Sequence, residues 1–127
     1  MKTEEMTGKQ LQRALKHYDL TPNDVAAHAG CSAAEVRVAF ETTPPSPEIA
    51  MAIGVVLHER RMWELRKWRS ALEFARAQIA DAGPATIGWL RADEQQALRA
   101  LRTLADEGSD DEICAIACRE LLATAEK

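Results

Sequence analysis

Cysteine and histidine are the side chains best suited to bind a transition metal or to act as nucleophiles, and the sequence contains three of each. Cys114 and Cys118 lie one helical turn apart, so they could share a helix face. A structural metal site usually needs four ligands, and the remaining candidates show no ligand spacing: Cys31, His17, His28 and His58. We interpret the cysteines as small, buried apolar residues. A redox switch through Cys114 and Cys118 is a weaker hypothesis.

Catalytic patterns are absent from the sequence. Nothing resembles a nucleophile–base pair, a glycine-rich loop that cradles phosphate, or a pair of catalytic carboxylates. The acidic run over residues 106–112 lacks the alternating ligand spacing of a calcium loop and fits a helix cap better. We therefore expect a protein that is not an enzyme and that uses no metal and no cofactor.

Composition and charge limit the class of protein. The chain has 127 residues, 46% of them apolar, and a net charge of −4, which suits one or two small globular domains. No apolar run approaches the roughly 18 residues of a membrane span, and the polar N-terminus does not resemble a signal peptide, so we expect a cytoplasmic protein. Charge is distributed unevenly along the chain. Residues 61–80 hold five basic and two acidic residues, whereas residues 81–127 hold five basic and ten acidic residues.

Helix-start signals occur at six places, and no segment alternates β-branched residues as a strand would. Each signal pairs a capping side chain with Pro, Glu, Gln or Asp at the first turn. They are Thr7-Gly8-Lys9-Gln10, Thr21-Pro22, Ser32-Ala33-Ala34-Glu35, Ser46-Pro47, Asp93-Glu94-Gln95-Gln96 and Ser109-Asp110-Asp111-Glu112. The sequence therefore predicts an all-α chain.

Apolar spacing predicts where the helices run. The expected ranges are about 8–18, 22–29, 33–41, 94–106 and 110–125, with a helix from Pro47 that continues, or bends near His58, to about Asp81. Ala82-Gly83-Pro84 breaks that helix, and Gly108 separates the last two. The predicted core of the first half comprises Leu11, Ala14, Leu15, Tyr18, Val25, Ala26, Ala29, Val36, Ala39, Phe40, Ile49, Ile53, Val56 and Leu57.

The segment over residues 22–41 has the pattern of two short helices that meet at a tight turn. Ala26 is small where the helices approach, Gly30 suits the turn, and Val36 is an apolar wedge between them. The string D-V-A-A-H-A-G-C-S-A-A-E-V-R-V-A-F resembles the helix-turn-helix of the phage-repressor, Cro and XRE-type family. With the preceding helix and P-E-I-A-M-A-I-G-V-V-L after it, the resemblance covers about residues 7–58.

This resemblance implies a lambda-repressor-like domain that binds double-stranded DNA. In the family, the helix after the turn enters the major groove. The implied groove-facing residues are Ser32, Ala33, Ala34, Arg37 and Glu41, with Arg37 suited to guanine and Ala33 or Ala34 to a thymine methyl group. The implied phosphate contacts are Thr21 and Asn23 at the second helix, and Lys9, Arg13 and Lys16 on the first.

An alternative is that the same fold serves as a protein-interaction module, such as an anti-repressor, an antitoxin or an adaptor. Pro22 stands where many relatives have Gln, and the groove-facing surface includes Glu41, which phosphate would repel. Ala34 and Val38 would then belong to a contact patch.

The middle helix has apolar residues on two faces. Leu65, Trp68, Leu72, Ala75 and Ile79 follow the three-four spacing of a coiled coil or a helical hairpin, and Trp63 and Phe74 fall nearly opposite. One face could pack on Ala97, Leu98, Leu101 and Leu104, and the other on a second subunit; an intramolecular bundle is the alternative. We predict a homodimer that uses Trp63, Leu65, Trp68, Leu72, Phe74 and Ile79.

These interpretations divide the chain into a DNA-binding domain, residues 1–60, and a helical region for dimerisation or partner binding, residues 61–127. Arg66 and Lys67, interleaved with tryptophans, are further phosphate candidates. The hypothesis is a bacterial or phage-encoded transcriptional regulator, with repression at a short operator favoured over activation. A protein regulator could bind the C-terminal helices.

Overall fold

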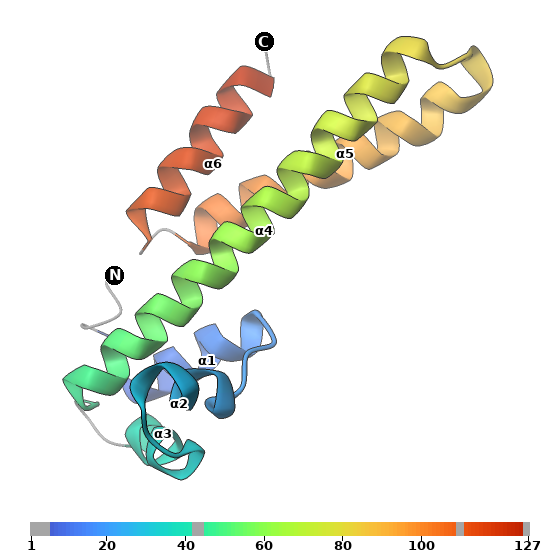
Figure 1. Cartoon of the computed structure of the whole chain (residues 1–127). Coiled ribbons are helices and arrows are strands. Elements are labelled where there is room, and N and C mark those ends of the chain that lie inside the picture. Colours follow the sequence, from blue (N-terminus) through green and yellow to red (C-terminus); the bar gives the residue numbers. More distant parts are fainter. Residues whose placement is uncertain (1–5, 42–44, 109–110, 126–127) are drawn as a thin grey trace. The chain divides into compact units, whose positions relative to one another are not determined.

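The computed structural model describes residues 6–41, 45–108 and 111–125, and these residues form six α-helices and no strand (Figure 1). The predicted all-α class is confirmed. The chain divides into two compact units, Met1–Arg60 and Arg61–Lys127, and each is described here by itself. None of the helices in the described ranges is both long enough and apolar enough to span a membrane.

The first unit contains α1 (Gly8–His17), α2 (Pro22–Ala29), α3 (Ala33–Glu41) and the first part of α4 (Pro47–Asp81). The helix α3 contacts both α1 and α2. The predicted core is largely confirmed, with Ala14, Ala29 and Ile49 only half-buried. Its fully or nearly fully buried members are Leu11, Leu15, Tyr18, Val25, Ala26, Val36, Ala39, Phe40, Ile53, Val56 and Leu57.

Helix α1 begins with the predicted reciprocal cap. The Gln10 N–H donates to the Thr7 hydroxyl oxygen at 3.2 Å, and the Thr7 N–H donates to the Gln10 side-chain oxygen at 2.9 Å. These bonds satisfy two donors that the first turn leaves open. The helix ends at His17, after which Asp19 adopts a left-handed conformation with φ of 57°.

Gly8 allows α1 to lie directly against the end of α3. A Cβ atom at this position would lie 2.7 Å from the carbonyl oxygen of Ala39 and closer still to that of Phe40. No side chain fits there without moving backbone. Because glycine has no side chain, the start of α1 and the last turn of α3 can approach each other this closely.

Helix α4 runs on through His58 as a single helix of 35 residues. Ala82 and Gly83 interrupt the helical conformation as predicted, and α5 (Pro84–Glu107) starts directly after them. The predicted helix start at Asp93 is wrong, because Gly83 is the N-terminal cap and Pro84 supplies the first helical residue. Proline suits that position, since its missing N–H has no helical partner there.

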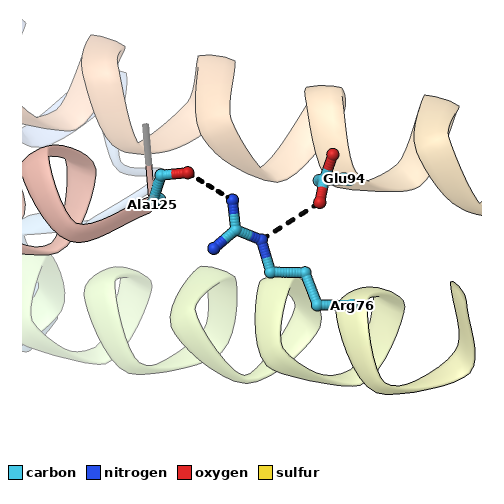
Figure 2. A network of polar contacts seen from close by, with 3 residues as sticks. All are labelled: Arg76, Glu94 and Ala125. Atoms are coloured by element: carbon cyan, nitrogen blue, oxygen red, sulfur yellow. Dashed lines mark hydrogen bonds and ion pairs between the residues drawn. The ribbon is translucent and has the colours of Figure 1, made fainter. Parts of the chain in front are cut away.

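The second unit is a three-helix arrangement of the latter part of α4, α5 and α6 (Glu112–Ala125). Helices α5 and α6 contact each other. Arg76 of α4 links both of them, because its Nε donates to Glu94 at 3.0 Å and its Nη2 donates to the carbonyl oxygen of Ala125 (Figure 2). The core is built from Leu65, Leu72, Ala75, Ala97, Leu98, Leu101, Leu104, Ala105, Cys114, Ala115, Cys118 and Ala125.

Helix α6 is capped by Asp111, whose carboxylate accepts the N–H of Cys114 at 3.2 Å. The helix begins at Glu112, two residues after the predicted start at residue 110. Ser109 and Asp110 of the predicted cap lie outside the described residues. The predicted start is therefore corrected by two residues, with Asp111 as the observed capping side chain.

Candidate nucleic-acid interface

The helices α2 and α3 are separate and are joined by a tight turn. Gly30 ends α2 with φ of 68° and ψ of 31°, a left-handed conformation that glycine adopts without strain. The N–H groups of Gly30 and Cys31 both donate to the carbonyl oxygen of Ala26, at 3.0 and 3.3 Å. Ala26 and Val36 are buried, at 8% and 0% exposure. The small residue, the glycine turn and the apolar wedge therefore take the positions that the sequence predicts for them.

Helix α3 divides into a buried and an exposed face. Val36, Ala39 and Phe40 are buried, and α3 as a whole contacts α1 and α2. The opposite face presents one basic, one acidic and small or apolar side chains to solvent: Ala34, Arg37, Val38 and Glu41. Ala33 is half-buried. The predicted outward orientation of Arg37 is thus observed, whereas its role in reading a base is still a prediction.

Thr21 is tied to Asp24 at the start of α2. The Asp24 carboxylate accepts the backbone N–H of Thr21 at 2.7 Å and its hydroxyl at 2.9 Å. These bonds, with a smaller contribution from the positive charge of Arg60, lower the pKa of Asp24. Both donors of Thr21 are thereby used within the protein. Of the two phosphate contacts predicted here, only the exposed Asn23 has a side chain that is not drawn into this cap.

The starts of α3 and α4 also carry carboxylates. The Ser32 hydroxyl accepts the N–H of Glu35 at 3.2 Å and donates to its carboxylate at 3.3 Å. The Ser46 hydroxyl donates to Glu48 at 3.2 Å. Helix N-termini attract anions, and here protein carboxylates already take that place. A phosphate group that approached this unit would therefore need positive partners other than these helix starts.

Helix α1 supplies such partners. Lys9, Arg13 and Lys16 are exposed and lie at spacings of four and three residues, which places them along one side of the helix. Residues Gly8–His17 include no Asp or Glu. Among the described helices of the first unit, α1 is therefore the most favourable surface for a phosphate backbone.

Arg66 and Lys67 belong to the second unit and are exposed. The Lys67 ammonium lies 5.5 Å from the ring centre of Trp63 and 4.9 Å from that of Trp68, a cation–π geometry. The indole N–H of Trp68 donates to Glu64 at 3.1 Å. Lys67 is thus held near two aromatic rings of its own helix, and its contact with phosphate stays a prediction.

The residues predicted for dimerisation fall into three groups. Leu65 and Leu72 are buried within a single chain, at 7% and 2% exposure. Trp68 and Ile79 are half-buried. Trp63 and Phe74 are 46% and 66% exposed. The seam that begins at Leu65 therefore forms part of the chain's own helical hairpin, and of the residues predicted for dimerisation Trp63 and Phe74 are the exposed ones.

Cys114 and Cys118 are fully buried, as predicted for small apolar residues. A hydrogen bond between the two thiols, together with burial, raises the pKa of Cys114. Cys31 is half-buried, and the three cysteines form no disulfide. In the described ranges, no group of three or more histidine, cysteine or acidic side chains could hold a metal ion.

A groove of about 310 Å³ lies beside α2 and the start of α4, and the sequence analysis missed it. Its lining includes His28, Glu48, Met51 and Val55, and the last two are 59% and 46% exposed. His28 and Glu59 approach to 3.4 Å. The four-residue spacing of Met51 and Val55 is the available signal, because it marks a second apolar side of α4, opposite the Ile49 and Ile53 side.

Comparisons with models of known protein families, with curated proteins and with solved structures found no match for this chain.

Proposed function

We propose that the first unit is a helix-turn-helix domain of the phage-repressor type and that the protein is a sequence-specific transcriptional regulator. It would bind a short operator as a homodimer, with repression by promoter occupancy as the favoured action. The observation that supports this most is the packing of α2 and α3 around the turn at Gly30, with Arg37 on the exposed side of α3. In helix-turn-helix proteins the second helix of the pair inserts into the major groove.

The roles follow from the exposed side chains. Arg37 would donate to the O6 and N7 atoms of guanine, and Ala34 would meet a thymine methyl group. The backbone phosphates would be held by Lys9, Arg13 and Lys16 of α1. At the start of α2 we assign the phosphate contact to Asn23, because the donors of Thr21 are bound to Asp24.

The salt dependence of DNA binding tests the phosphate role of α1. Affinity for a random-sequence duplex would be measured by fluorescence anisotropy over a range of salt concentrations, with Lys9, Arg13 and Lys16 replaced together by Gln. Each lost phosphate contact lowers the slope of log affinity against log salt by about 0.9, so three lower it by about 2.7.

A triple Gln variant of exposed arginines in the second unit, Arg91, Arg99 and Arg119, is the matched control. It removes the same number of positive charges and should leave the slope almost unchanged. Equal slopes for both variants would contradict the assignment to α1.

A second candidate function, a protein-interaction module, is favoured by one specific observation. Val38 is 63% exposed beside the outward Arg37, so the exposed face of α3 offers an apolar side chain to a protein partner. Carboxylates at the starts of α2 and α3 also reduce attraction to phosphate. No DNA binding at low salt, together with a stable protein complex that Val38→Glu disrupts, would favour this function over the first.

A further inference from the structure

The exposed face of α3 combines a polar edge with an apolar edge. Successive residues of a helix are rotated by about 100°, so the outward side chains occupy an arc of about 100° opposite the buried side. Around the helix their order is Arg37, Glu41, Ala34 and Val38. Val38 is 63% exposed and stands at one edge of this arc, with Arg37 at the other. The side chains of Ala34 and Val38 have no hydrogen-bonding group, so this edge can recognise a ligand only through apolar contact.

Thymine is the base whose major-groove edge carries an apolar group. Its C5-methyl group projects into the groove, whereas adenine and cytosine present amino donors there and guanine presents two acceptors. A valine placed against a donor or an acceptor would exclude water from it without replacing the lost hydrogen bond, which costs free energy. Against a methyl group, the same side chain buries apolar surface and gains free energy. A valine in the groove therefore favours thymine for both reasons.

The spacing on α3 separates the apolar contacts from each other. Ala34 and Val38 lie four residues apart, which is about 6 Å along the helix axis. Successive bases of one strand are about 3.4 Å apart along the duplex axis. In a helix that lies along the groove, the two side chains therefore meet different base pairs. The contact of Val38 can thus be measured separately from that of Ala34.

We infer that Val38 is a specificity-determining residue of the proposed DNA site and that it selects one thymine of each half-site through the C5-methyl group. The ligand is duplex DNA in which this thymine lies close to the guanine bound by Arg37. This role rests on the proposed function, because it requires α3 to enter the major groove.

Deoxyuridine tests the methyl contact, because it differs from thymidine only in lacking the C5-methyl group. The probe is the duplex that the wild-type chain enriches from a random library, with each thymine of a half-site replaced in turn. Affinity would be measured by fluorescence anisotropy at one fixed salt concentration. Loss of one buried methyl contact should weaken wild-type binding by about fourfold.

Val38→Ala assigns one of these contacts to the Val38 side chain. At one thymine, the loss caused by deoxyuridine should disappear in Val38→Ala. It should stay about fourfold in the control Val55→Ala, which shortens an exposed valine of α4 in the same unit. Losses at any thymine read by Ala34 should be the same in all three proteins. Circular dichroism of each variant checks that it is folded.

The outcomes separate this role from the function on which it rests. An enriched sequence whose binding is insensitive to deoxyuridine at every thymine would overturn the role of Val38 and leave the proposed function in place. A deoxyuridine loss that is the same in wild type and Val38→Ala at every thymine would do so as well. No enrichment by the wild type would contradict the proposed function and the role of Val38 together.

Discussion

The Asp24 carboxylate accepts both hydrogen-bond donors of Thr21, the backbone N–H at 2.7 Å and the hydroxyl at 2.9 Å. This single side chain closes the start of α2 and keeps a negative charge at the place where a helix-turn-helix protein would approach phosphate. The cap that stabilises the fold and the surface that would bind DNA are therefore in conflict at these two residues.

Replacement of Asp24 by Asn should destabilise the protein in a pH-dependent way. The hydrogen bonds from Thr21 lower the pKa of Asp24 below its ordinary value of 3.8. A carboxyl whose pKa is lowered in the folded state stabilises fully above its unfolded value, and this stability is lost as the pH falls through the folded value. Urea unfolding at several pH values should show the largest deficit near neutrality, shrinking in acid. A deficit that stays constant with pH would contradict this account.

The same Asp24→Asn variant should bind DNA more tightly than the wild type. The substitution removes a negative charge beside the expected phosphate position, while Asn23 keeps its donor. Anisotropy at one fixed salt concentration measures the difference. Glu112→Gln is the control, because it removes an acidic residue from the first turn of α6 in the second unit. Affinity that rises equally in both variants would indicate a general charge effect and no local contact.

Gly8 and Gly88 form a matched pair for testing the close approach of α1 and α3. Gly8→Ala should lower the free energy of unfolding by about 1–3 kcal/mol, because its Cβ would collide with the backbone of Ala39 and Phe40. Gly88→Ala meets nothing within 4 Å and should raise it by up to about 1 kcal/mol through helix propensity. Chemical denaturation measures both values, and a neutral Gly8→Ala would contradict the observed packing.

The local features of the first unit could be predicted because adjacent residues determine them. Thr7 with Gln10, Ser32 with Glu35, and Gly30 after α2 are capping and turn signals that act within three or four residues. The same local logic failed at α5. The sequence predicts only a break at Gly83-Pro84, whereas proline is equally suited to begin a helix, and Asp93 lies within α5 and begins no helix.

In the candidate interface, the sequence predicts on which side of a helix a residue lies, and little more. The outward face of Arg37 follows from the burial of Val36 and Phe40, which the spacing indicates. Which apolar side of α4 its own chain would cover could not be predicted, because Leu65 and Phe74 are equally apolar and the packing of α5 and α6 decides between them. The hydrogen bonds from Thr21 to Asp24 depend on the rotamer of Asp24, so the sequence alone could not distinguish Thr21 from Asn23 as a phosphate ligand.

Cysteine reactivity should follow burial. Cys31, which is half-buried, should react first with iodoacetamide in the native protein, and Cys114 and Cys118 should react only after unfolding, because both are fully buried and burial raises the pKa of Cys114. Mass spectrometry after pulsed alkylation should detect one modified cysteine in the native state and three in denaturant. Rapid native modification of Cys114 or Cys118 would contradict the observed packing and revive the redox hypothesis.

In the proposed function, the exposed side of α3 reads DNA sequence through Arg37. Selection from a random duplex library tests it most directly, with wild type, Arg37→Ala and the exposed-arginine control Arg119→Ala compared. We expect wild type and Arg119→Ala to enrich the same sequence. Arg37→Ala should lose discrimination at one base pair of each half-site, a loss of about 1–3 kcal/mol. No enrichment by the wild type, or an identical sequence preference in Arg37→Ala, would contradict the claim.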